Sequence, residues 1–199
     1  MDTLRAFIAV PVSDEVRATV ASVEENLRGL GADVKWVDPQ NVHLTLKFLG
    51  AVEAGRIGDV GSALKSALAG TDGSGITVAG AGTFPPGKKN VRVVWLGITE
   101  GQAALVEIAR RVDDACAALG FAREERPFSP HLTIGRVRRE SGRLADLARG
   151  VAALEFNPLK VDIDRVNLMR SELSPKGPTY TVLDSFALGE SGKGGGVWI

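Results

Sequence analysis

Histidine and cysteine are scarce in this chain of 199 residues, which contains two histidines and one cysteine. A single cysteine, Cys116, excludes an intrachain disulfide and a metal site built from several thiolates. Two histidines without a further nitrogen or sulfur ligand also make a poor zinc site. We therefore expect neither a bound metal nor another cofactor.

A net charge and a long apolar run are absent as well. The 24 lysine and arginine residues balance 24 aspartate and glutamate residues, so the composition does not predict a surface for long duplex nucleic acid. A few local cations are still enough to hold a small phosphate group. The apolar start LRAFIAVPV is broken by Pro11 and is too short to span a membrane or to act as a signal peptide. We expect a cytoplasmic protein that does not bind membranes.

Helix-like and strand-like patterns are interspersed along the chain. Ser13 is a suitable N-cap for the first helix, which Gly31 closes. The expected helices lie near 16–30, 57–68, 105–119 and 144–151. The expected strands lie near 4–10, 34–37, 42–50, 75–84, 90–99, 131–137, 159–169 and 179–188.

Short turns link several of these strands, which favours an α+β fold with largely antiparallel sheets over a doubly wound parallel sheet. A similar order of elements early and late in the chain indicates two related lobes. We predict one bilobal domain over residues 1–188, followed by a glycine-rich tail over residues 189–199.

Both histidines stand in the same tripeptide, His-Leu-Thr, within the stretches NVHLTLKFLG and FSPHLTIGRV. Side chains at positions i and i+2 of a strand point to the same face. His43 and Thr45 therefore share a face with Lys47, and we expect Leu44, Leu46 and Phe48 to pack into the core.

The second tripeptide gives the same alternation, with His131 and Thr133 on one face and Leu132 and Ile134 on the other. Arg136 stands three residues after Thr133 and points to the opposite face of a regular strand. It reaches the face of Thr133 only if the strand twists, bulges or ends there.

Two opposed imidazoles suit an in-line displacement at phosphorus. One removes a proton from the attacking water while the other protonates the departing oxygen, which predicts a bell-shaped dependence of rate on pH. Threonine hydroxyls can donate to the phosphate oxygens, and a nearby cation offsets the developing charge.

A lone histidine in a strand is more often structural than catalytic, and one His-x-Thr match recurs by chance. Two copies that use both histidines of the chain favour a functional pair over that structural interpretation.

With these paired motifs the sequence resembles the 2H phosphoesterases, which are named for two His-x-Thr-x motifs. Among them it resembles most the RNA 2′,3′-cyclic phosphodiesterase family, also called 2′-5′ RNA ligase or LigT-like proteins. The resemblance rests on WVDPQNVHLTLKFLG, GTFPPGKKNVRVVWLGI, RPFSPHLTIGRVRR and LMRSELSPKGPTYTVL, and it covers nearly the whole chain.

The resemblance implies a two-lobed fold with antiparallel sheets flanking a central cleft, helices on the outer faces and one motif in each lobe. It also implies metal-independent hydrolysis of an RNA 2′,3′-cyclic phosphate to a 2′-phosphomonoester. By this analogy His43 is the proton donor, His131 is the proton acceptor, and Thr45 and Thr133 bind phosphate. Arg136 matches a position that is often basic in the family.

Several assignments stay open at this stage. Phe84, Arg92 and Trp95 are candidates for a nucleobase pocket, although Trp95 in RVVWLGI is more often a core residue, and Tyr180 lines the cleft or packs a strand. The same chemistry run in reverse is a 2′-5′ RNA ligase, and a non-catalytic binder of 2′-phosphorylated RNA ends is a further alternative. Nothing in the sequence requires more than a monomer.

Overall fold

The computed structural model describes residues 2–87, 90–175 and 177–189, so all but the first residue of the predicted glycine-rich tail lies outside the described residues. The strands are β1 (Thr3–Pro11), β2 (Val34–Trp36), β3 (His43–Glu53), β4 (Ser74–Phe84), β5 (Val93–Glu100), β6 (His131–Val137), β7 (Leu159–Ile163), β8 (Arg165–Ser174) and β9 (Gly177–Ala187). The α-helices are α1 (Asp14–Arg28), α2 (Ile57–Leu68), α3 (Gln102–Ala118) and α4 (Leu144–Ala152), and short 3₁₀ helices cover Pro39–Asn41 (η1) and Ala54–Arg56 (η2).

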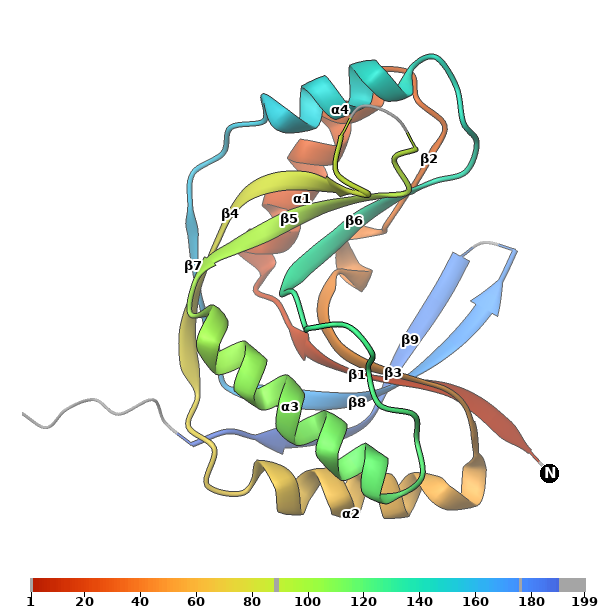
Figure 1. Ribbon diagram of the computed structural model, residues 1–199, viewed down its shortest axis with the longest axis vertical. Coiled ribbons are helices and arrows are strands. Elements are labelled where there is room, and N and C mark those ends of the chain that lie inside the picture. The colour runs from red at the N-terminus through yellow and green to blue at the C-terminus, as the bar shows by residue number, and fades with distance from the viewer. Residues whose placement is uncertain (1, 88–89, 176, 190–199) are drawn as a thin grey trace, which may run out of the picture.

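The strands form two antiparallel sheets (Figure 1). We call them sheet A, with the order β3-β1-β8-β9, and sheet B, with the order β2-β6-β5-β4-β7. Each sheet draws strands from both halves of the chain, because the chain crosses between the sheets several times. The predicted α+β class with antiparallel sheets is confirmed, and the division into one domain and a tail stays a prediction.

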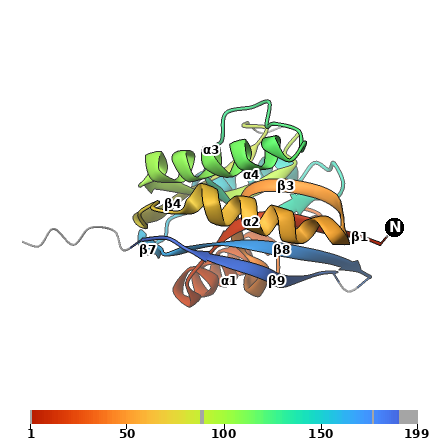
Figure 2. The same cartoon turned by 90° about the horizontal axis from the view of Figure 1, so that it is seen from below.

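The helices pack in two pairs. Helices α2 and α3 lie side by side near β3 and β9 of sheet A, and α1 lies beside α4, which packs near β4 of sheet B (Figures 1 and 2). Helix α1 begins as the sequence predicts, because the Val16 amide donates a hydrogen bond to Ser13 Oγ at 3.4 Å. Gly29 rather than Gly31 caps its end. The described part of the chain has no helix that is long and apolar enough to span a membrane.

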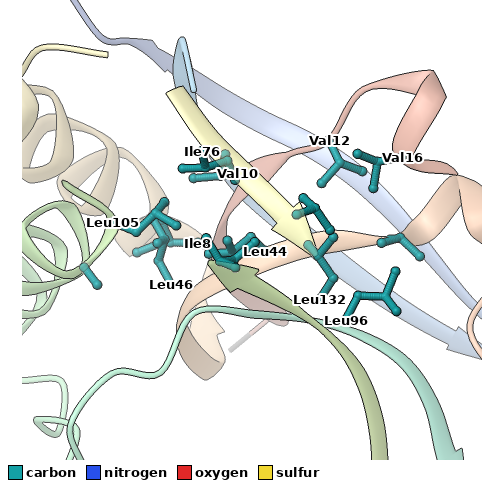
Figure 3. Packing of buried hydrophobic residues seen from close by; sticks show 14 of the residues in the cluster. Ile8, Val10, Val12, Val16, Leu44, Leu46, Ile76, Leu96, Leu105 and Leu132 are labelled. Carbon is teal, nitrogen blue, oxygen red and sulfur yellow. The ribbon is translucent and has the colours of Figure 1, made fainter. Parts of the chain in front are cut away.

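One apolar cluster joins the two sheets. Leu44 of β3 and Leu132 of β6, the central residues of the two His-Leu-Thr tripeptides, are both buried in this cluster, and Figure 3 draws both among its residues. Burying a leucine side chain stabilises a fold by about 2 kcal/mol. The shared cluster therefore anchors both motif strands to the same core.

A β-bulge follows each tripeptide. On β3, Thr45 pairs with Ala9 and Lys47 pairs with Ile8, so Leu46 is an extra residue in the ladder to β1. On β6, Thr133 pairs with Trp95 and Gly135 pairs with Val94, so Ile134 is extra in the ladder to β5. Because a bulge shifts the alternation by one residue, two consecutive side chains turn to the core face in each strand.

The type of residue that follows each bulge depends on whether its strand has neighbours on both sides. Strand β6 lies between β2 and β5, and a Cβ on Gly135 would approach Val34 Cγ1 to 2.7 Å and Trp36 Cε3 to 2.9 Å. Only glycine fits there. Strand β3 is an edge strand, and it carries a lysine at the corresponding position.

This lysine, Lys47, is buried, with 2% of its side chain exposed. Its ammonium group contacts Asp113 Oδ1 of α3 at 2.5 Å and donates to the Ala122 carbonyl at 2.7 Å. Asp113 Oδ1 also accepts a hydrogen bond from the Glu124 amide at 3.2 Å. The ion pair thus fastens β3 to α3 and to the loop that leads toward His131.

We predict that Lys47→Met lowers the free energy of unfolding by about 3 kcal/mol, because the variant leaves the mostly buried Asp113 carboxylate with only the exposed Arg123 as a cationic partner. Urea denaturation measures this change. The double variant Lys47→Met/Asp113→Leu should recover most of the loss, since it removes both buried charges, and Lys160→Met, at an exposed position of β7, is the control. A stable Lys47→Met protein would show that the ion pair does not hold the fold.

Candidate active site

His43 is held by the backbone that precedes it. Its Nδ1 lies 2.7 Å from the carbonyl oxygen of Asn41, which is the last residue of η1. A carbonyl only accepts hydrogen bonds, so Nδ1 carries the proton and donates it. Asn41 is itself fixed by two hydrogen bonds. Its backbone N–H donates to the Asp38 carbonyl at 2.7 Å, and its side-chain Nδ2 donates to the Pro178 carbonyl at 3.1 Å. Nε2 is then the nitrogen of His43 that is free to exchange a proton.

His131 has the same arrangement. Its Nδ1 lies 2.7 Å from the carbonyl oxygen of Ser129, again two residues before the histidine. This ring too is therefore protonated at Nδ1 and presents Nε2 for chemistry. The two motifs match in their hydrogen bonds as well as in their letters.

Aromatic rings surround both imidazoles. The ring of His43 stacks on Phe7 with centroids 4.7 Å apart, and the Tyr180 ring meets its edge at 5.3 Å. The ring of His131 makes an edge contact with Phe84 at 5.1 Å and lies 6.5 Å from Trp95. Each imidazole is thus fixed on one side by a carbonyl and on the other by aromatic packing.

The two motif threonines pair with residues of the neighbouring strands. Thr45 lies opposite Ala9, and Ala9 lies opposite Asn167 on β8. Thr133 lies opposite Trp95, which in turn lies opposite Gly82, where any side chain would clash with the indole ring. Neither threonine hydroxyl donates a hydrogen bond within the described residues, so both are available to a ligand.

We call the face of each sheet that carries its motif histidine and threonine the site face. Because Ile134 is the extra residue of the β6 bulge, Arg136 pairs with Val93 and returns to the site face of sheet B. The condition set by the sequence, that a bulge must bring Arg136 to the face of Thr133, is met.

The charge of Arg136 acts across the site. Burial lowers the pKa of His43 below its usual value, the hydrogen bond to Asn41 opposes this shift, and the Arg136 guanidinium lowers the pKa further. Burial raises the pKa of Tyr180, and Arg136 again lowers it. The charge of an arginine on sheet B therefore acts on two titratable groups of sheet A.

A cavity of about 160 Å³ lies beside His43 on sheet A. Its walls include Asn41, His43, Asn167, Met169 and Tyr180. Arg17 also lines it, and the buried Nε of this residue has no hydrogen-bond partner among the described residues. The cavity combines apolar surface with amide and guanidinium groups, as sites for small polar ligands do.

Two predicted positions are wrong. Lys47 does not share the site face with His43, because the bulge at Leu46 turns it to the core side, where Asp113 binds it. Phe48 is not a core residue but is 62% exposed and lies opposite Phe7 on the site face. The bulge therefore reverses the faces that simple alternation assigns to Lys47 and Phe48.

The predicted base-pocket residues separate into two groups. Phe84 contacts His131, and Trp95 is half-buried beside it on the site face. Arg92 precedes β5, and its exposed guanidinium pairs with Glu140 at 3.0 Å. Sequence reasoning does not find Phe7, Asn41 and Ser129, because they belong to no catalytic motif. Only their contacts with the histidines identify them as part of the site.

The arrangement can bind an oxyanion and move protons on both sides of it. Two hydroxyls, one guanidinium and two imidazoles with free Nε2 atoms are the groups that this chemistry needs. The described residues contain no group of three or more histidine, cysteine, aspartate or glutamate side chains that could hold a metal ion.

A sequence model of the 2′-5′ RNA ligase superfamily matches residues 7–175. The chain belongs to this superfamily, which confirms the resemblance to 2H phosphoesterases.

Relatives match over nearly their whole length. A Methanothermobacter thermautotrophicus protein named RNA 2′,3′-cyclic phosphodiesterase is 37% identical over 187 residues, which cover 93% of this chain and 99% of the relative. A Thermotoga maritima protein of the same name is 35% identical over 180 residues, covering 90% and 93%. The crystal structure of E. coli LigT complexed with 3′-AMP aligns with a TM-score of 0.75 and 25% identity, covering 94% of this chain and 99% of that one.

We predict that Arg136→Met raises the pKa of His43, because it removes a positive charge that lowers this pKa. NMR titration in a His131→Ala background measures the effect directly, since His43 is then the only histidine. Arg149→Met in α4 is the matched control and should leave the titration unchanged. An unchanged His43 pKa in Arg136→Met would show that Arg136 lies too far from the site to act there.

Proposed function

We propose that this protein hydrolyses RNA 2′,3′-cyclic phosphate ends to 2′-phosphomonoesters by acid–base catalysis with two histidines. The observation that carries the proposal is the matched pair of imidazoles, each with Nδ1 held by the carbonyl two residues earlier and Nε2 left for proton exchange. The names of the relatives, which match over most of the chain, support the choice of substrate.

In this mechanism His131 takes a proton from water as the water oxygen attacks phosphorus. The bond from phosphorus to the ribose 3′ oxygen breaks on the opposite side, and His43 gives that oxygen its proton. The product keeps its phosphate on the 2′ oxygen. The assignment of donor and acceptor rests on the family resemblance, since each histidine makes the same kind of hydrogen bond, to the carbonyl two residues earlier.

A donor must hold a proton before it can give one. The lowered pKa of His43 means that, before substrate binds, this residue gives up its proton more readily than an ordinary histidine. A cyclic phosphate carries one negative charge, and an anion beside an imidazole favours its charged form. We therefore expect His43 to gain its proton as the substrate binds.

Thr45 and Thr133 would donate to the two non-bridging phosphate oxygens, and Arg136 would balance the charge that develops on them. Preorganised donors of this kind stabilise a transition state because they need no reorientation during the reaction. Lys47 has no part in this step, because its ammonium group is bound to Asp113.

The terminal nucleoside would lie on the His43 side, since the leaving 3′ oxygen belongs to its ribose. The cavity beside His43 suits this group, because Tyr180 and Met169 offer apolar surface and Asn167 and Arg17 offer polar atoms. Phe84 would shape the opposite side, beside His131.

Reversal of the same steps joins a 5′-hydroxyl to the cyclic end, and the superfamily carries the name of that ligase reaction. A non-catalytic binder of RNA ends would not need two titratable groups with matched tautomers, so hydrolysis remains the better interpretation. The cytoplasmic location, the monomeric state and the independence of metals stay predictions.

We predict that His43→Ala and His131→Ala each lower turnover of a cyclic-phosphate-ended oligonucleotide by about 10²- to 10⁴-fold, the usual scale for an acid or base group. Chromatographic separation of the 2′-phosphate product, with chelator present throughout, measures the rate. Arg165→Met, at an exposed start of β8, is the control for general effects of substitution. Near-normal turnover in both histidine variants would exclude the mechanism.

A further inference from the structure

Two cations lie side by side on adjacent strands of sheet B. Lys35 is the central residue of β2 and pairs directly with Arg136 of β6. Both residues are exposed. Residues directly opposite each other in an antiparallel pair have Cβ atoms about 5 Å apart on the same face. Lys35 therefore extends the site face of sheet B by one strand beyond Arg136.

The position of this pair relative to the motif follows from the register. Thr133 and Arg136 are two pairing positions apart on β6, because Ile134 is the extra residue of the bulge. Two strand steps span about 7 Å, and the step across to β2 adds about 5 Å at a right angle. The Cβ atom of Lys35 thus lies about 8–9 Å from that of Thr133, and the long lysine side chain can bring its ammonium group closer.

Neither cation has a carboxylate within 4.0 Å among the ion pairs of residues 2–87, 90–175 and 177–189. Arg92 and Arg139, which flank the same region, do pair with acids, with Glu140 and Asp33 respectively. Like charges directly opposite in a sheet destabilise it slightly. The pair is therefore a place where a bound anion relieves repulsion.

The pair also adjoins the reaction site. The charge of Arg136 adds to the lowering of the pKa of His43 and opposes the burial that raises the pKa of Tyr180, so one end of the pair acts on the groups around the reaction site. Lys35 is the other end, on the edge strand β2. A guanidinium has five donors and can serve two anions at once, whereas a lysine ammonium acts as a point charge.

We propose that Lys35, together with Arg136, binds the RNA phosphodiester next to the reacting cyclic phosphate, so that the enzyme favours oligonucleotide ends over cyclic mononucleotides. The inference rests on the proposed function and extends it to the length of the substrate. Among the described residues Lys35 makes no cation–π contact with an aromatic ring, which fits a phosphate rather than a base at this position.

The test compares two substrates, a tetranucleotide that ends in a 2′,3′-cyclic phosphate and the matching cyclic mononucleotide. In Lys35→Met, the ratio of kcat/KM for the tetranucleotide to that for the mononucleotide should fall about 5- to 10-fold, mainly through KM. The slope of log kcat/KM against log salt for the tetranucleotide should become shallower by about 0.7, the value for one contact to a single strand.

Two control variants define the role of the charge. Lys35→Arg keeps a cation at this position and should preserve most of the preference. Lys65→Met removes an exposed lysine of α2, on the helical side of sheet A, and should leave the ratio unchanged. Matching thermal melts establish that the variants are folded.

An unchanged ratio in Lys35→Met, or an equal loss on both substrates, overturns the inference while the proposed function stands. If the unmodified protein hydrolyses neither substrate, the proposed function itself fails. The two failures are therefore distinguishable in one set of assays.

Discussion

The β-bulge after each His-Leu-Thr tripeptide is the constraint on which the site depends. It begins where regular alternation ends, after the histidine and threonine have turned to the site face and the leucines of both motifs to one shared core. It then decides which cation reaches the site face. On β3 the bulge turns Lys47 inward to Asp113, and on β6 it turns Arg136 outward to the site face. One local irregularity, used twice, thus separates a cation that is buried in an ion pair from a cation on the site face.

The two halves of the site are alike in chemistry but not in surroundings. Both imidazoles donate from Nδ1 to a carbonyl at 2.7 Å, which fixes the tautomer and leaves Nε2 for the reaction. His43 is the more enclosed of the two, with Phe7 stacked on it and Tyr180 at its edge. This burial, with the charge of Arg136, lowers its pKa. The two motifs are thus alike in their hydrogen bonds but differ in environment, and the lowered pKa of His43 means that this donor needs an anion beside it to hold its proton.

Much of this could be predicted from the sequence, because apolar periodicity determines strands and helices and the repeated tripeptide marks the site. The bulges could not be predicted. Leu46 and Ile134 are apolar under either register, so the letters do not reveal which residue is extra. The ion pair of Arg92 with Glu140 could not be predicted either, because the two residues are distant in sequence. Lys35 was missed for a related reason, since only the register of β2 on β6 brings it beside Arg136.

The pH dependence of kcat/KM for a cyclic-phosphate-ended oligonucleotide tests the central claim most directly. If one histidine acts as base and the other as acid, the unmodified protein gives a bell-shaped profile, because the base must be neutral and the acid must be charged. His131→Ala should lose the limb that rises with pH, and His43→Ala should lose the limb that falls. A bell that persists unchanged in either variant would contradict the account, since the limbs would then belong to other groups.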